Sequence, residues 1–128
     1  RYSTHNENTF SNTSVLVLDT VGLLSSCYQY AQIAYVGGGM GTKGLHNILE
    51  PAAAGIPIVI GKNYASFPEA VQLVNIGGII SISNAPEAKE KLLSLIHDRN
   101  QRQETGEINL HFIRASQGAT TKIMDTLL

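Results

Sequence analysis

Four short apolar runs, rich in β-branched residues, constrain the fold of this chain more than any other feature of its sequence. They occupy residues 14–18, 33–36, 56–60 and 78–82, and segments of helical length separate them. Short apolar strands that alternate with helices are typical of a parallel sheet covered on both faces. We therefore predict an α/β fold with a Rossmann-like parallel sheet flanked by helices.

The segments outside these runs indicate where the helices lie. Gly55 and Gly77 fall where the C-caps of two such helices belong. A polar lead-in, residues 1–13, precedes the first run, and the part from residue 85 onward has helical periodicity. The predicted helices cover residues 22–32, 47–55, 67–77, 85–97, 102–115 and 119–128.

Charge and composition exclude several classes of partner. The net charge of −1, without a basic run, gives no reason to expect a nucleic-acid partner. The single cysteine, Cys27, provides neither a disulfide nor a metal framework, and no stretch reaches the roughly 18 apolar residues of a membrane helix. Because the sequence begins without Met, in a polar segment, we expect a fragment of a longer chain.

Polar residues gather directly after the predicted strands. In a parallel α/β sheet the carboxyl ends of the strands lie at one edge, where ligands bind. This pattern predicts a binding cleft at that edge. The segments concerned are 19–22, 37–44, 61–64 and 83–84.

The glycine-rich segment 37–44 admits more than one interpretation. Its last six residues, 39–44, satisfy the pattern G-x-G-x-x-G between a strand and a helix, which suggests a dinucleotide site. The acidic residue expected about 20 positions later is missing, because Gly61 and Lys62 stand there. A glycine loop that leads into a helix can also bind a single phosphate, or can merely allow close packing.

The start of the next helix is equally open to two readings. Asn47 and Glu50 have the spacing of a capping box, and Pro51 then lies in the first turn. This arrangement explains both residues without a ligand. His46, beside a phosphate-type loop, has little structural need to be there. Asp19 could likewise cap a helix that starts at Gly22.

These residues together resemble a known signature. The segment Gly37-Gly38, followed by Gly44-x-His46-Asn47-x-Leu49-Glu50-Pro51-Ala52-Ala53, is similar to that of the Kdo (3-deoxy-D-manno-octulosonic acid) transferases of lipopolysaccharide synthesis. The segment Asp19-Thr20-Val21-Gly22 is similar to their Asp-Thr-Met-Gly element, and Phe67-Pro68-Glu69 to a later Phe-x-acid element. Leu23 stands where an acid often follows, so no catalytic role is carried over to that position.

The resemblance implies the C-terminal, donor-binding half of a GT-B glycosyltransferase, with residues 1–128 forming one nucleotide-sugar-binding domain. The glycine loop would cradle the phosphate of CMP-Kdo and Glu50 would face the ribose. Lys62 and Asn63 are candidates for the sugar carboxylate, or belong to a solvated loop. The implied nucleotide-binding set is Gly37, Gly38, Gly39, Gly44, His46, Asn47 and Glu50, with Asp19, Lys62 and Asn63 as further candidates.

The family would transfer Kdo from CMP-Kdo to a lipid A precursor at the cytoplasmic face of the bacterial inner membrane. The resemblance places the catalytic base, the lipid contacts and any membrane association in the other half, so the isolated chain should be inactive. It implies no cofactor and no metal, only the donor substrate. Two alternatives stay open: a UDP-sugar enzyme of the same fold, either another glycosyltransferase or a sugar-nucleotide epimerase, and a non-catalytic Rossmann-like module that binds a protein or NAD(P).

Overall fold

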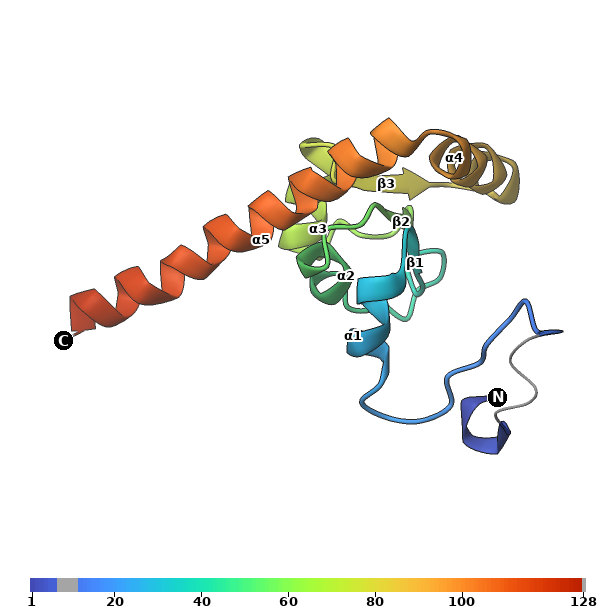
Figure 1. Ribbon diagram of the computed structural model, residues 1–128. Helices are drawn as coiled ribbons and strands as arrows, with labels where there is room; N and C mark the ends of the chain where they lie inside the picture. The colour runs from blue at the N-terminus through green and yellow to red at the C-terminus, as the bar shows by residue number, and fades with distance from the viewer. Residues whose placement is uncertain (7–11, 128) are drawn as a thin grey trace. The chain divides into compact units, whose positions relative to one another are not determined.

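The computed structural model describes residues 1–6 and 12–127, and the chain divides into two compact units, Arg1–Tyr30 and Ala31–Leu128 (Figure 1). The first unit contains the short helices η1 (Tyr2–Thr4), α1 (Leu24–Cys27) and η3 (Tyr28–Tyr30). The second contains β1 (Ala34–Val36), α2 (Leu49–Ala53), β2 (Ile58–Gly61), α3 (Pro68–Asn75), β3 (Ile79–Ile82), α4 (Ala85–His97) and α5 (Arg99–Leu127). Each unit is described by itself.

The Ala31–Leu128 unit is built on a three-stranded parallel sheet in the order β1-β2-β3. Val36 pairs with Ile60 across the first ladder, and Ile60 pairs with Ser81 across the second. Helix α2 lies in the crossover from β1 to β2, and α3 lies in the crossover from β2 to β3. The predicted α/β class, a parallel sheet flanked by helices, is confirmed.

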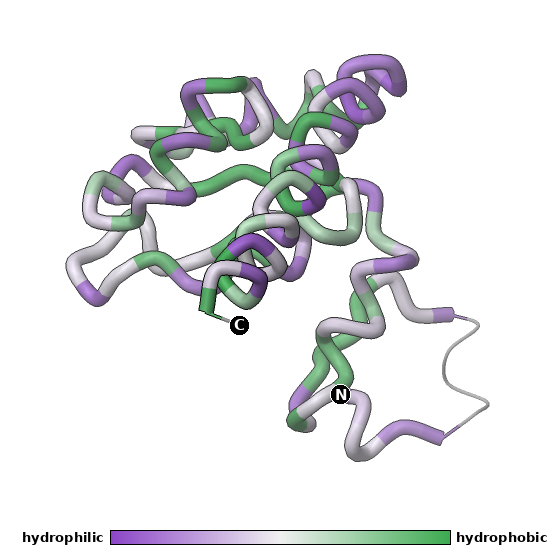
Figure 2. Tube along the Cα trace, turned by 90° about the vertical axis from the view of Figure 1, so that its left-hand side faces the viewer, coloured by the Kyte–Doolittle hydropathy of each residue, from purple (hydrophilic) through white to green (hydrophobic). Residues whose placement is uncertain are grey.

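The central strand β2 is buried along its whole length, as a continuous apolar run predicts. Val59 packs with Ile82 of β3 and Leu95 of α4, so α4 covers one face of the sheet. Ile58 and Ile60 are fully buried and project from the opposite face of the strand. Figure 2 shows hydrophobic residues gathered in the interior of this unit and hydrophilic ones on its outer helices and loops.

Helix α5 is fixed to the amino-terminal ends of β2 and β3. Asn109, fully buried, donates from Nδ2 to the carbonyls of Ile56, at 2.9 Å, and Gly78, at 2.7 Å. The helix also approaches the backbone closely at Gly106, where an added Cβ would lie 2.1 Å from the carbonyl oxygen of Gly55. Because these contacts lie at the amino ends of the strands, the carboxyl edge of the sheet stays clear of them.

Three predicted elements outside the sheet differ from the structure. The run 14–18 forms no strand, although the carbonyl of Val17 accepts a hydrogen bond from the Tyr2 backbone N–H. A strand requires a neighbouring strand for its backbone groups, and the described part of its unit contains none. The helices predicted at 102–115 and 119–128 are one helix, α5, which continues through Gly118. Figure 1 shows its last turns extending beyond the rest of the unit.

The helix predicted at 22–32 is only the short α1 followed by η3, whereas the remaining elements match their predictions closely. The runs 33–36, 56–60 and 78–82 contain β1, β2 and β3, and the prediction for α4 has the observed bounds. Gly55 and Gly77 follow α2 and α3 with positive φ values of 70° and 86°, as expected of helix C-caps. These successes come from continuous apolar runs and strong terminal signals, which act locally.

Candidate functional site

The segment 37–44, which we call the glycine loop, follows β1 at the carboxyl edge of the sheet and folds back on itself. Gly38 has φ of 90°, and a Cβ there would lie 2.0 Å from the Gly44 carbonyl oxygen. Gly44 itself has φ of 97°. Both positions therefore require glycine, for conformation and, at Gly38, for close approach.

The glycine loop also lies against the end of β2. A Cβ on Gly61 would lie 2.2 Å from the carbonyl carbon of Gly39. Asn63 donates twice to the loop, from its backbone N–H to the Gly39 carbonyl at 2.8 Å and from Nδ2 to the Gly41 carbonyl at 3.0 Å. Close packing thus accounts for much of the glycine content, and Asn63 holds the loop in place.

The glycine loop leads into α2 through His46 and Asn47. The His46 backbone N–H donates to the Gly37 carbonyl at 3.0 Å, and a Cβ on Gly38 would lie 3.1 Å from the imidazole Cδ2. The backbone N–H of Leu49, the first residue of α2, donates to Asn47 Oδ1 at 2.9 Å. The polar and glycine residues of the signature are therefore brought together at one corner of the sheet.

The capping box expected at Asn47 and Glu50 is wrong, because Asn47 Oδ1 accepts from Leu49 and not from the Glu50 backbone N–H. Glu50 accepts from the side-chain Nδ2 of Asn47 at 3.3 Å, and no backbone N–H donates to its carboxylate among the described hydrogen bonds. Helix α2 begins at Leu49, with Ile48 as its N-cap residue, and Pro51 lies in the first turn as predicted. The Glu50 carboxylate keeps most of its acceptor capacity.

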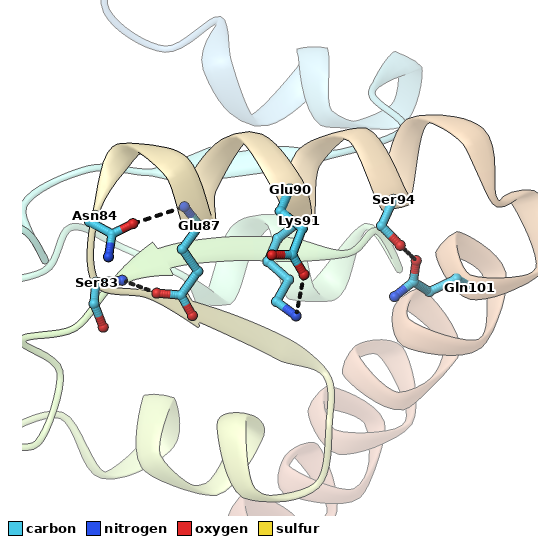
Figure 3. Close-up of polar contacts among 7 residues, drawn as sticks. All are labelled: Ser83, Asn84, Glu87, Glu90, Lys91, Ser94 and Gln101. Atoms are coloured by element: carbon cyan, nitrogen blue, oxygen red, sulfur yellow. Dashed lines mark hydrogen bonds and ion pairs between the residues drawn. The ribbon is translucent and has the colours of Figure 1, made fainter.

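A second Asn-x-x-Glu sequence begins α4, and there both side chains accept hydrogen bonds from backbone N–H groups (Figure 3). Asn84 Oδ1 accepts from the Glu87 backbone N–H at 2.9 Å, while Glu87 Oε2 accepts from the Ser83 backbone N–H at 2.8 Å. Although Ser83 and Asn84 lie at the predicted cleft edge, their polar groups are used to start a helix.

Two cavities lie beside α2. The smaller, of about 160 Å³, is lined by Leu45, His46, Asn47, Ile48, Leu49, Phe67 and Glu69. The larger, of about 480 Å³, is lined by Leu49, Glu50, Ala53, Glu69, Phe112, Ile113, Ser116 and Gln117. Sequence reasoning missed the lining residues from α5, because nothing local marks them. It noted Glu69 only as part of a resemblance to a Phe-x-acid element.

Lys62 and Asp19, two further candidates for the nucleotide site, lie in different units and have different surroundings. Lys62 follows β2 with an exposed side chain. Asp19 belongs to the Arg1–Tyr30 unit, where its carboxylate accepts from the hydroxyl and the backbone N–H of Ser3. These hydrogen bonds, the hydroxyl one first, lower the pKa of Asp19 below its ordinary 3.8. The cap role suggested for Asp19 is wrong, because α1 begins at Leu24 without a side-chain cap.

The described residues contain no group of three or more His, Cys, Asp or Glu placed to hold a metal ion. Among the same residues, no helix has the length and apolar character needed to cross a membrane.

Comparison with known proteins identifies the family to which this chain belongs. No family model matches the chain. A 3-deoxy-D-manno-octulosonic acid transferase of Haemophilus influenzae is 32% identical over 124 residues, which is 95% of this chain. A Bordetella pertussis protein of the same name is 31% identical over 114 residues, or 88% of the chain. The chain belongs to the 3-deoxy-D-manno-octulosonic acid transferase family. It spans only 29% and 27% of the lengths of these two relatives.

A solved structure places the similarity within this family. The crystal structure of the C-terminal CMP-Kdo binding domain of WaaA from Acinetobacter baumannii matches with a TM-score of 0.64 and 26% identity. The match covers 75% of this chain and 50% of that one. Within the family, this chain is thus similar to a C-terminal domain that is described as CMP-Kdo binding.

Proposed function

We propose that this chain is the donor-binding half of a Kdo transferase, which transfers Kdo from CMP-Kdo to a lipid A precursor. The observation that carries the proposal is the similarity of this chain, over 75% of its length, to a CMP-Kdo binding domain. The domain assignment of residues 1–128 and the GT-B arrangement of the full-length enzyme are part of this proposal.

The proposed donor site lies at the carboxyl edge of the sheet. Backbone N–H groups of the glycine loop, at Gly37, Gly38 and Gly39, would receive the phosphate. His46 and Asn47 would border it, and Gly44 would keep the loop in its folded-back form. The Glu50 carboxylate, which among the described residues accepts from the Asn47 amide alone, suits the ribose hydroxyls.

The roles proposed at the end of β2 are supporting ones. Asn63 would hold the glycine loop through its two hydrogen bonds, instead of contacting the sugar. Lys62, exposed at the same edge, would provide a positive charge for the carboxylate of Kdo. Asp19 is kept as a candidate, although its carboxylate is engaged by Ser3.

Transfer also requires a base that deprotonates the acceptor hydroxyl. We assign this base, the lipid A precursor contacts and any association with the cytoplasmic face of the inner membrane to the other half of the enzyme. No cofactor is proposed, and CMP-Kdo is the only small molecule that the mechanism needs. The chain by itself should bind nucleotide and catalyse nothing.

An NMR titration tests the proposal. The chain is titrated with CMP, UDP and NADH while its amide shifts are followed. CMP-selective shifts concentrated at residues 37–50 would support it, and shifts with UDP alone would favour a UDP-sugar enzyme of the same fold. If neither the chain nor the full-length protein responds to CMP, the proposal is wrong.

A further inference from the structure

We propose that the cavity between α2 and α5 receives the nucleoside of the donor, and that Glu69 selects cytosine there. This inference rests on the proposed function, because it assumes a cytidine nucleotide whose phosphate lies at the glycine loop. It adds a base-recognition site and a specificity residue to that function. Figure 1 shows α5 passing beside α2, consistent with the contacts between these helices.

The cavity has the size and lining of a nucleoside site. Its volume of about 480 Å³ lies within the usual range for small-molecule pockets, about 300–1,000 Å³. Leu49, Ala53, Phe112 and Ile113 form apolar walls, and Phe112 is a half-buried aromatic ring against which a flat base can pack. The other four lining residues, Glu50, Glu69, Ser116 and Gln117, are polar and can fix the orientation of a ligand.

The position of this cavity relative to the glycine loop also supports a nucleoside as its ligand. The larger cavity shares Leu49 and Glu69 with the smaller one, which His46 and Asn47 also line. Those two residues directly follow the glycine loop. The shared wall therefore runs from the proposed phosphate site to the proposed base site, in the order in which a nucleotide presents phosphate, ribose and base.

Three of the four polar side chains of the cavity offer acceptors alone or have their donor engaged, and the fourth, Gln117, has an amide that can accept or donate. Glu50 and Glu69 contribute carboxylates. The Ser116 hydroxyl donates to the Phe112 carbonyl at 2.9 Å, so toward a ligand its oxygen can act as an acceptor. Cytosine offers the N4 amino group as a donor, whereas uracil has an acceptor, O4, at the corresponding position. An acceptor-rich wall should therefore prefer cytosine and repel uracil.

The two carboxylates can be assigned by their neighbours. Glu50 is partnered with Asn47, beside the proposed phosphate site, which suits the ribose. No described hydrogen bond engages the Glu69 carboxylate, which lies in the first turn of α3 and lines the cavity together with α5. Glu69 is therefore the residue placed to accept from the cytosine amine.

Glu69→Gln tests this assignment in the full-length protein, with CMP and UMP affinities measured by calorimetry. The wild type should prefer CMP by about tenfold or more, and the variant should lose most of that preference because its amide can also donate to O4. Glu87→Gln is the matched control, since Glu87 also follows a proline in the first turn of its helix. Its preference should equal that of the wild type.

A second variant tests the base-packing wall. Phe112→Ser should weaken CMP and UMP about equally, with the melting temperature recorded separately to detect misfolding. If the full-length protein binds CMP with shifts at the glycine loop, but both variants keep the wild-type affinities and preference, the nucleoside is elsewhere and only this inference fails. If CMP does not bind at all, the proposed function fails with it.

Discussion

The two Asn-x-x-Glu sequences of this chain start two helices in different ways. At α4, Glu87 accepts a backbone N–H and the box is closed. At α2, the one described hydrogen bond to the Glu50 carboxylate comes from the side chain of Asn47, and the carboxylate lines a cavity. Identical spacing thus yields a structural carboxylate in one place and an available one in the other.

The preceding residue explains the difference. Before α4, the Ser83 backbone N–H points to the carboxylate of Glu87 and is satisfied by it. Before α2, the N–H four residues before the glutamate belongs to His46 and already donates to the Gly37 carbonyl, and the N-cap lies one position closer to the glutamate, at Ile48. The glycine loop therefore removes the donor that would engage Glu50. A loop that folds back on itself in this way leaves a carboxylate available to a ligand.

The largest effect should come from breaking this loop. Gly38→Ala places a Cβ 2.0 Å from the Gly44 carbonyl oxygen in a backbone with φ of 90°. We expect a loss of about 2 kcal/mol or more in the free energy of unfolding, and loss of nucleotide binding. Gly41→Ala is the control, because nothing lies within 4 Å of its added Cβ. Equal denaturation midpoints for the two variants would contradict the packing argument.

The two glutamates themselves should respond oppositely. Glu87→Ala should lower the free energy of unfolding by about 1 kcal/mol, since it leaves the Ser83 N–H without its partner. Glu50→Ala should change stability by at most about 0.5 kcal/mol, because it has no backbone partner to lose. It should instead weaken CMP binding about tenfold, as expected for losing roughly 1.4 kcal/mol of binding free energy. Thermal unfolding measures the stability of both variants, and calorimetry measures their affinity for CMP. If Glu50→Ala is destabilised and binds CMP with unchanged affinity, Glu50 only stabilises the start of α2.

Gly118 offers a smaller test, because this glycine does not interrupt the helix that contains it. It lies inside α5 with nothing within 4 Å of an added Cβ. Gly118→Ala should therefore stabilise the protein by about 0.5–1 kcal/mol through helix propensity. Denaturation by urea measures the gain, and no gain would indicate that α5 is not helical at this position in solution.

The smallest effect concerns Asp19, a third carboxylate and one that, like Glu87, is engaged by a backbone N–H. Its lowered pKa means that the folded state favours the ionised form, so its contribution is present at neutral pH. That contribution is lost as the pH falls below about 3.8 and through the lowered pKa. The Ser3 amide shift should titrate over that range in the wild type. In Ser3→Ala the carboxylate should titrate at higher pH; the same midpoint in both proteins would remove Ser3 as the cause.

Local sequence signals predicted most of the fold. The apolar runs at 33–36, 56–60 and 78–82 gave the sheet, because continuous apolar segments of that length need burial on both faces. The run 14–18 has the same composition but forms no strand, since pairing depends on a neighbour that composition does not specify. The prediction of two helices around Gly118 fails for another reason, because one glycine lowers helix propensity by only about 1 kcal/mol.

The sequence by itself determined the parallel sheet, the helix ends at Gly55 and Gly77, and the concentration of glycine and polar residues at the carboxyl edge. Only the tertiary structure decided which polar groups stay available there. Hydrogen bonds from His46 and Asn63 to the glycine loop connect residues that spacing alone does not relate. Whether a carboxylate such as Glu50 is free depends on which N–H groups have other partners, and that is settled only when the chain has folded.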